Sequence, residues 1–167
     1  MRDTPVFSLV AFSGTGKTTY LERLIPLLKA RGLRVGVVKH HGHDTPLDQK
    51  GKDSWRFARA GADVTAVVSP GQAAFIENRG LSPEEAAERI WGVDLILTEG
   101  YKSGPWPKIA LCRGGGAPPV PLEACAAVVS DRPAEGPAPV FPLDDPAPLA
   151  DWLAGQVELI RIRRQMT

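Results

Sequence analysis

The sequence predicts an α/β fold in which a mostly parallel sheet is flanked by helices. Two observations predict it. Residues 6–12 form an almost continuous apolar run of strand length, which is typical of a parallel strand covered on both faces. Further apolar runs then alternate with helix-like segments, and this alternation indicates a parallel sheet whose ligands lie at the carboxyl ends of its strands.

The remaining elements are expected in chain order. Apolar residues recur at helical spacing over residues 21–28, and Gly32 stands where a C-terminal glycine ends such a helix. We expect strands at residues 34–39, 63–69 and 93–98, with residues 72–77 pairing beside the second of these. Asp53 and Ser54 can cap one further helix, and Ser82 opens another that runs to Ile90.

Prolines crowd the chain beyond residue 102, so the segment from about 103 to 148 is predicted to be less regular. Short strands at residues 108–112 and 124–129 and a last helix from about Pro146 are still expected. A chain of 167 residues fits one core, and we predict a single nucleotide-binding domain over residues 1–167.

Composition excludes several classes of function. The formal net charge is +1, with no long basic run, so neither nucleic acid nor an anionic membrane is an expected partner. No apolar run approaches the ~20 residues of a membrane-spanning helix. Cys112 and Cys125 form no CxxC pair and no signal-peptide pattern opens the chain, so we expect two free thiols and a cytoplasmic location.

The first strand is followed by a phosphate-binding loop. Residues 11–18, A-F-S-G-T-G-K-T, match G-x-x-x-x-G-K-[ST] except at Ala11, and a strand and a helix flank them as in P-loop NTPase-like folds. The glycines would admit phosphate oxygens close to the backbone, the lysine would neutralise them, and Thr18 would complete the Mg²⁺ shell. The candidate nucleotide-binding residues here are Ser13, Gly14, Thr15, Gly16, Lys17, Thr18 and Thr19.

An acidic residue ends the strand predicted at residues 93–98. The sequence D-L-I-L-T-E-G places Glu99 where P-loop proteins present a carboxylate to Mg²⁺. Its long side chain can reach the metal through water, because Mg²⁺ keeps several waters and takes only one or two carboxylates. The alternative is a surface acid at the end of a strand.

All three histidines lie in K-H-H-G-H-D, residues 39–44, within a polar loop of residues 40–52. This loop is either a transition-metal site, or a switch-like segment that orders around Mg²⁺ and the γ-phosphate, which we prefer. Asp48 and Asp53 are the preferred metal or water ligands, and His43 joins Asp48 and Glu99 as a candidate catalytic residue. For His40, packing at a strand end and catalysis are equally open.

Three motifs together resemble the molybdopterin-guanine dinucleotide biosynthesis protein B (MobB) family. They are A-x-S-G-T-G-K-T-T, K-H-x-x-H-D-x-x-x-D-x-x-G-K-D-S and D-L-I-L-x-E-G-Y-K, and the resemblance spans residues 5–132. It implies a GTP-binding, weakly hydrolysing homodimer that assists a MobA-like guanylyltransferase in joining GMP to molybdopterin. It also implies that Lys17, Thr18, Asp48, Asp53 and Glu99 contact nucleotide and Mg²⁺, with Thr18, Glu99 and Asp48 at the metal.

The sequence does not identify the base of the nucleotide directly, because it contains no N-K-x-D or T-K-x-D string for guanine. Asp131 follows a late strand and could accept the N1–H and N2–H₂ donors of guanine. A turn residue before Pro133 is the alternative.

Two functions fit these observations. The first is a GTP-binding adapter of molybdenum-cofactor maturation, and the second is a kinase that moves the γ-phosphate to a small hydroxyl acceptor. A kinase lid usually groups arginines around the phosphoryl group, whereas Arg56, Arg59 and Arg79 are scattered, which favours the adapter.

Overall fold

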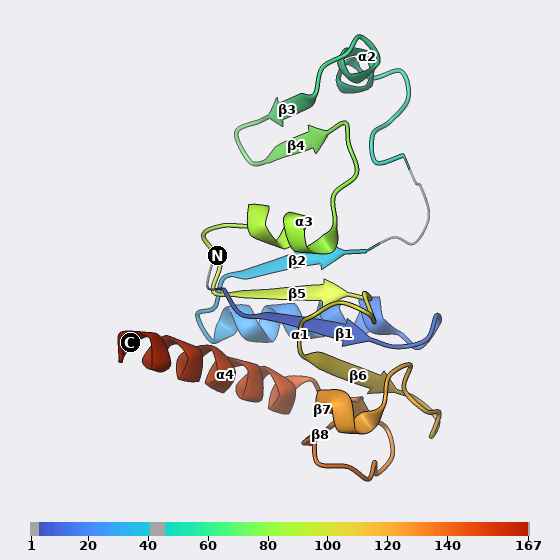
Figure 1. Cartoon of the computed structure of the whole chain (residues 1–167), viewed down its shortest axis with the longest axis vertical. Coiled ribbons are helices and arrows are strands. Elements are labelled where there is room, and N and C mark those ends of the chain that lie inside the picture. The colour runs from blue at the N-terminus through green and yellow to red at the C-terminus, as the bar shows by residue number, and fades with distance from the viewer. Residues whose placement is uncertain (1–3, 41–45, 167) are drawn as a thin grey trace. The chain divides into compact units, whose positions relative to one another are not determined.

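The protein is described from a computed structural model that places residues 4–40 and 46–166 (Figure 1). The chain folds into two compact units, one formed by Met1–His40 with Pro83–Thr167 and the other by His41–Ser82. Whether residues 1–167 behave as one domain stays a prediction, since compactness does not say whether two units unfold together.

The first unit is built on a parallel sheet of six strands among the described residues. The strand order is β2-β5-β1-β6-β7-β8, and every neighbouring pair is parallel. The strands are β1 Val6–Val10, β2 Val35–Lys39, β5 Leu95–Glu99, β6 Lys108–Cys112, β7 Cys125–Ser130 and β8 Val140–Pro142. The predicted parallel sheet is thereby confirmed, with β1 between β5 and β6.

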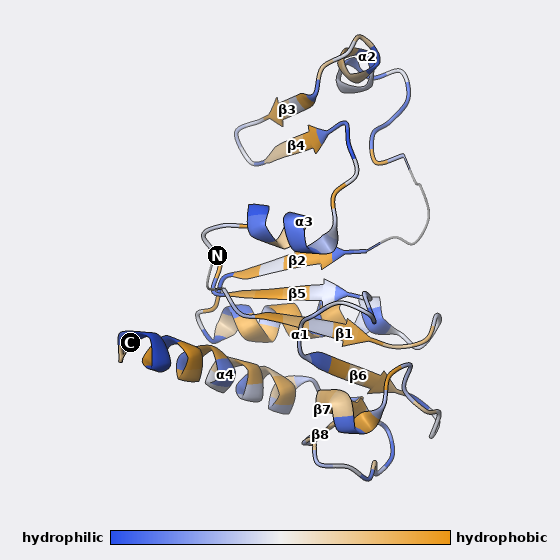
Figure 2. Ribbon diagram, viewed as in Figure 1, coloured by the Kyte–Doolittle hydropathy of each residue, from blue (hydrophilic) through white to orange (hydrophobic). Residues whose placement is uncertain are grey.

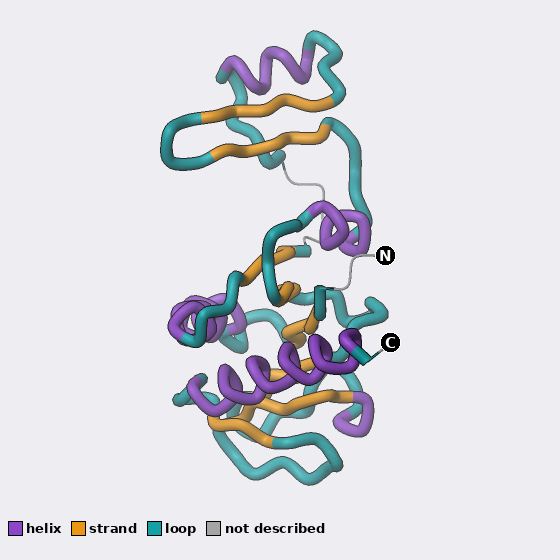
Figure 3. Tube along the Cα trace, turned by 90° about the vertical axis from the view of Figure 1, so that its left-hand side faces the viewer, coloured by secondary structure: helices purple, strands orange, loops and turns teal. Residues whose placement is uncertain are grey.

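One face of this sheet is covered by α1 Lys17–Ala30 and α4 Ala147–Gln165, which pack against each other (Figures 1 and 3). Because strand side chains alternate between faces, Leu9 and Leu97 point to this side while Val10 and Ile96 point to the other. All four are buried, so these strands are apolar on both faces. In Figure 2 the ribbons of β1 and β5 are coloured mainly as hydrophobic.

The opposite face is covered in two different ways. At one end, α3 Pro83–Arg89 packs Ala87 against Ile96. At the other end, the proline-rich chain supplies Val120 and Leu122, of which the latter begins the 3₁₀ turn Leu122–Ala124, over Val128. The irregular segment thus covers this part of the sheet face, which explains why a proline-rich segment is partly buried.

The second unit contains α2 Asp53–Arg59 and a hairpin of β3 Val64–Val68 and β4 Ala73–Glu77 (Figure 3). The expected pairing is confirmed and is antiparallel, with Val64 opposite Glu77. The short connection between the strands allows this antiparallel pairing, and among the described strands the hairpin forms a sheet of its own.

One expectation about the elements needs correction, and one strand was not expected. Asp53 and Ser54 do not cap α2: Lys52 is the N-cap residue, no side chain caps the helix, and the Ser54 hydroxyl is bonded to Asp48 instead. The strand β8 is not predicted by the sequence, because three residues ending in proline carry too short a pattern. No helix of the described chain combines the length and apolar character needed to cross a membrane.

Candidate nucleotide-binding site

The phosphate loop joins the carboxyl end of β1 to the first turn of α1. Gly14 and Gly16 have φ angles of 77° and 98°, in the left-handed region that glycine adopts without strain. Gly16 is the N-cap of α1, no side chain caps that helix, and no acidic residue lies in its first turn. The N-terminus of α1 therefore offers free backbone N–H groups and a positive dipole end to an anion.

Ala11 and Lys17 shape the base of this loop. Ala11 is buried at 3% exposure, and its φ is not positive, so alanine replaces the motif's first glycine without strain. The Lys17 ammonium donates to the carbonyl oxygens of Phe12, at 3.1 Å, and Ala11, at 3.4 Å. The lysine thus folds back over its own loop.

Two predicted metal ligands, 81 residues apart in sequence, are in direct contact. The Thr18 hydroxyl donates to Glu99 Oε1 at 2.8 Å, and the other carboxylate oxygen lies 3.8 Å from Lys39 Nζ. Glu99 reaches this position because it ends β5, where it pairs with Leu9 of β1 and Lys39 of β2. A hydroxyl and a carboxylate so placed could hold Mg²⁺, one directly and one through water.

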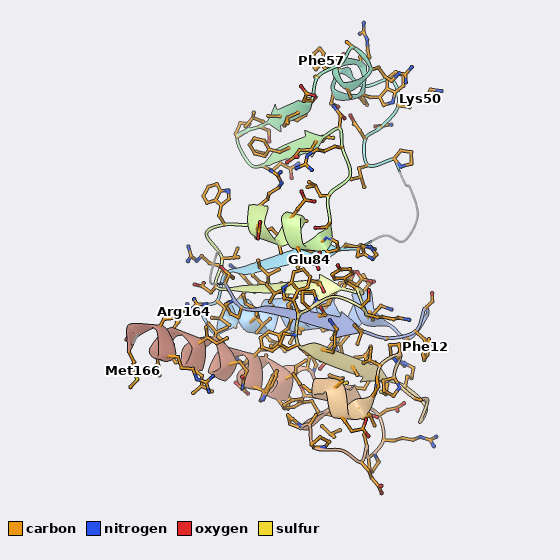
Figure 4. All side chains as sticks on the ribbon, in the orientation of Figure 1. Phe12, Lys50, Phe57, Glu84, Arg164 and Met166 are labelled. Atoms are coloured by element: carbon orange, nitrogen blue, oxygen red, sulfur yellow. The ribbon has the colours of Figure 1, made fainter. Side chains whose placement is uncertain are left out.

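Other predicted residues of the loop are placed at its surface. Ser13, Gly14 and Thr19 are exposed. The Thr15 hydroxyl donates to the Phe12 carbonyl at 2.9 Å, which closes the turn. Phe12 is 55% exposed at the loop tip (Figure 4), and the Lys102 ammonium lies 4.8 Å from its ring centre in a cation–π contact.

Arg113 is a site residue that the sequence reasoning missed. It directly follows β6, and its Nε donates to the Thr15 carbonyl of the phosphate loop at 3.1 Å. The signal that could have found it is an arginine at the carboxyl end of a buried strand, followed by three glycines. Only the strand order, which puts β6 beside β1, shows that this end meets the loop.

Asp131 lies at the same edge of the sheet, directly after β7. Both of its carboxylate oxygens accept the backbone N–H of Gly114 at 2.9 Å, so the side chain ties the end of β7 to the end of β6. This is a structural role, and the residue remains exposed. Recognition of guanine by Asp131 stays a prediction.

Asp48 and Asp53 belong to the second unit. Asp48 Oδ1 accepts from the Gln49 N–H at 2.7 Å and the Ser54 hydroxyl at 3.1 Å, while Oδ2 is buried with no hydrogen-bond partner among the described residues. Asp53 begins α2 and lies 3.6 Å from Arg56 in an exposed ion pair. Their contacts with nucleotide stay predictions, and His43 lies outside the described residues.

Tyr101 links the end of β5 to α3. Its φ of 63° is left-handed, which is rare for a residue with a side chain. Its hydroxyl donates to Glu84 Oε1 at 2.6 Å, a bond that raises the tyrosine pKa, and its ring centre lies 5.3 Å from that of His40. Figure 4 shows Glu84 on α3, beside the sheet. His40 therefore has a packing contact at its strand end.

Side chains that could bind a transition metal do not cluster in the part of the chain that the structure describes. Within residues 4–40 and 46–166, no group of three or more His, Cys, Asp or Glu side chains is arranged to hold a metal ion. His41 and His43 lie outside these ranges. Cys112 and Cys125 are both free and buried, and burial raises the pKa of both thiols.

Comparison with known proteins gives a consistent family. Residues 6–131 match the family model of molybdopterin guanine dinucleotide synthesis protein B, MobB. The molybdopterin-guanine dinucleotide biosynthesis adapter protein of Escherichia coli K12 is 39% identical over 159 residues, which is 89% of this chain and 91% of the relative. The protein of that name from Haemophilus influenzae is 38% identical over 137 residues, covering 78% and 77%.

Solved structures agree with these relatives. The crystal structure of Bacillus subtilis MobB superposes with a TM-score of 0.70 at 31% identity, covering 91% of this chain and 97% of that one. A crystal structure of molybdopterin-guanine biosynthesis protein B gives 0.69 at 28% identity, covering 92% and 99%. Sequence motifs, fold and relatives coincide, and the chain belongs to the MobB family of molybdopterin guanine dinucleotide synthesis proteins.

Proposed function

We propose that this protein is a GTP-binding adapter of molybdopterin guanine dinucleotide biosynthesis, which assists the attachment of GMP to molybdopterin. The observation that carries the proposal is the 2.8 Å contact between Thr18 and Glu99 at the uncapped N-terminus of α1. The adapter role is the one that the names of its relatives state.

The triphosphate is proposed to lie along the phosphate loop with Mg²⁺ beside Thr18 and Glu99. The Lys17 ammonium would exchange its two carbonyl acceptors for phosphate oxygens, which are stronger, charge-assisted acceptors. Glu99 would meet the metal through water while Lys39 keeps its second oxygen oriented. Asp48 is proposed as a further, outer-shell ligand of the metal, as the family motif implies.

Hydrolysis is proposed to be weak. Glu99 already accepts the Thr18 hydroxyl and lies near Lys39, which suits a metal-holding carboxylate more than a general base. The other catalytic candidates, Asp48 and His43, stay predictions from the sequence, and His43 lies outside the described residues. The shared adapter description of the relatives supports an accessory role over transfer of the γ-phosphate to a small acceptor.

A homodimer is part of the proposal, and the hairpin of the second unit supports it. Four large apolar side chains on β3 and β4 are about half exposed or more, and Figure 2 shows the hairpin as largely apolar: Val64, Val67, Val68 and Phe75. Both strands also have a free edge, since the hairpin forms a sheet of its own among the described strands. We propose that a second copy of this chain packs against these apolar residues of the hairpin. A MobA-like guanylyltransferase, with its molybdopterin, is the proposed further partner.

Calorimetric titration with GTP and ATP, each with Mg²⁺ and with EDTA, tests the nucleotide part. We expect GTP to bind more tightly than ATP, and Mg²⁺ to strengthen it. Lys17→Ala should abolish measurable binding with little change in fold, because an ammonium is lost without disturbing the core. Lys29→Ala, an exposed lysine in the last turn of the same helix, is the matched control and should bind normally.

The adapter part needs a second assay. Purified guanylyltransferase should make molybdopterin guanine dinucleotide faster with the wild-type protein than with Lys17→Ala. Equal rates with both would count against a nucleotide-dependent adapter. Rapid GTP turnover that depends on an added hydroxyl acceptor would instead favour the kinase.

A further inference from the structure

Arg113 places a cation directly against the phosphate loop, and it forms no ion pair with a carboxylate of the described chain. Its Nε bond to the Thr15 carbonyl, 3.1 Å long, uses one of five guanidinium donors. Its terminal nitrogen Nη2 lies 3.3 Å from the point that a Cβ on Gly16 would occupy. The guanidinium therefore lies against the N-cap of α1, and the residue remains exposed to solvent.

This position is electrostatically unfavourable for the protein alone. The N-terminus of a helix carries a partial positive charge, and Lys17 adds a full one at the same loop. A third positive group there is stabilised when a ligand supplies either negative charge or the electron-rich face of an aromatic ring. The arrangement indicates that Arg113 contacts the ligand and also supports the phosphate loop through its hydrogen bond to Thr15.

The order of the strands indicates which part of the ligand Arg113 would contact. The carboxyl ends of β5, β1, β6 and β7 follow one another along one edge of the sheet, about 4.8 Å apart. They carry in turn Glu99, which is the proposed metal ligand, the phosphate loop, Arg113 and Asp131. Arg113 thus lies on the side of the phosphate loop away from Glu99 and toward Asp131, the candidate residue for guanine, so this is the side on which the nucleoside would lie.

We infer that Arg113 forms part of the nucleoside subsite, with Nε bonded to the phosphate loop and the flat guanidinium stacked on the base. The inference rests on the proposed function, since it requires a nucleotide in this loop. Arginine suits the role because its planar group donates in-plane hydrogen bonds while its faces stay free to stack. The Asp131–Gly114 bonds fix the chain directly after it.

The test compares a whole nucleotide with its phosphates alone. Wild type, Arg113→Gln and Arg113→Lys are titrated with GTP and with inorganic tripolyphosphate, both with Mg²⁺. The control is Arg31→Lys, which loses an Nε bond of 2.7 Å, to Asp151, at the other end of α1. The ultraviolet difference spectrum of bound GTP is recorded at saturation, because stacking lowers the absorbance of the base.

Both Arg113 variants should lose about tenfold in GTP affinity, a typical loss for one stacked cation, and keep tripolyphosphate affinity within about twofold. They should also lose the stacking signal, while Arg31→Lys changes none of these. An equal loss for both ligands, no loss for either, or GTP affinity restored by lysine would overturn the inference. Failure of the wild type to bind GTP would instead overturn the proposed function.

Discussion

Glu99 occupies a point where three strands and the phosphate loop meet, between Lys39 of β2 and Leu9 of β1. Replacing it with glutamine keeps its size and removes its charge. We expect Glu99→Gln to weaken GTP binding about tenfold with Mg²⁺ and to leave it unchanged in EDTA, because the carboxylate acts through the metal. Glu22→Gln, an exposed residue on α1, is the control. Equal weakening in EDTA would contradict a metal-linked role.

Asp94 offers a test of stability rather than binding. Asp94 accepts hydrogen bonds from the Arg34 backbone N–H at 2.8 Å, from Arg34 Nε at 3.1 Å and from Arg161 at 2.8 Å. The hydrogen bonds from Arg34 are the largest cause that lowers the pKa of Asp94 to about 2, and the nearby charge of Arg161 lowers it further. A pKa below the unfolded value of ~3.9 means that ionised Asp94 stabilises the fold above about pH 4, and that this stabilisation is lost as pH falls through about 2.

Asp94→Asn should therefore lower the free energy of unfolding by about 1–3 kcal/mol at pH 7, as expected for lost hydrogen bonds to a charged group. Urea unfolding at pH 7 and near pH 2 measures it. The difference from wild type should shrink toward zero at the lower pH. A difference that stays constant with pH would show that the charge is not the cause.

Single residues also show where sequence reasoning reached its limit. Thr18 and Glu99 could be paired in advance, because each sits in a motif whose neighbours fix its position on a strand or helix. Arg113 could not be assigned to the site in advance, since its contact with the phosphate loop depends on β6 lying beside β1. The hydrogen-bond partner of Asp131 is a backbone N–H, and a sequence does not show which backbone group a side chain will contact.

The segment after β5 makes a prediction at the scale of elements. A Cβ on Gly104 would overlap the Tyr101 ring, whose hydroxyl is bonded to Glu84 of α3. Gly104→Ala should therefore destabilise the protein by about 1–3 kcal/mol, as overpacking does. Gly155, inside α4, has nothing within 4 Å of such a Cβ, and Gly155→Ala should stabilise by about 0.5–1 kcal/mol.

Thermal unfolding of the two variants measures this contrast. Shifts of the melting temperature in opposite directions are expected from the same chemical change. An unchanged melting temperature for Gly104→Ala would show that the Tyr101 ring can move away without cost.

Elements were predictable where their pattern was long. The apolar runs of β1, β5, β6 and β7 could be read directly, because buried parallel strands are apolar at nearly every position. The sheet to which β3 belongs could not be predicted, since an apolar run of five residues does not indicate which strands it pairs with. Likewise, prolines indicated irregular chain after residue 102 but not that this chain covers a sheet face.

At the scale of the whole molecule, the second unit is small and its helix α2 has no buried residue. Domains of about 40 residues rarely hold together alone. If a second copy covers the hairpin, hydrogen exchange in β3 and β4 should slow as protein concentration rises, while exchange in β1 stays constant. Mass spectrometry of exchange at two concentrations measures this. Hairpin exchange independent of concentration would contradict the proposed homodimer.

The central place of β1 in the sheet has a consequence for synthesis. The ribosome makes β1 before its neighbours β5 and β6, which come roughly 90 to 100 residues later. At about 5–20 residues per second, the nascent chain spends several seconds with both edges of an apolar strand unpaired. GTP cannot help the chain fold during that interval, because the loop that would bind it is not yet held in place. We therefore expect chaperones to hold β1 until Cys112 has emerged.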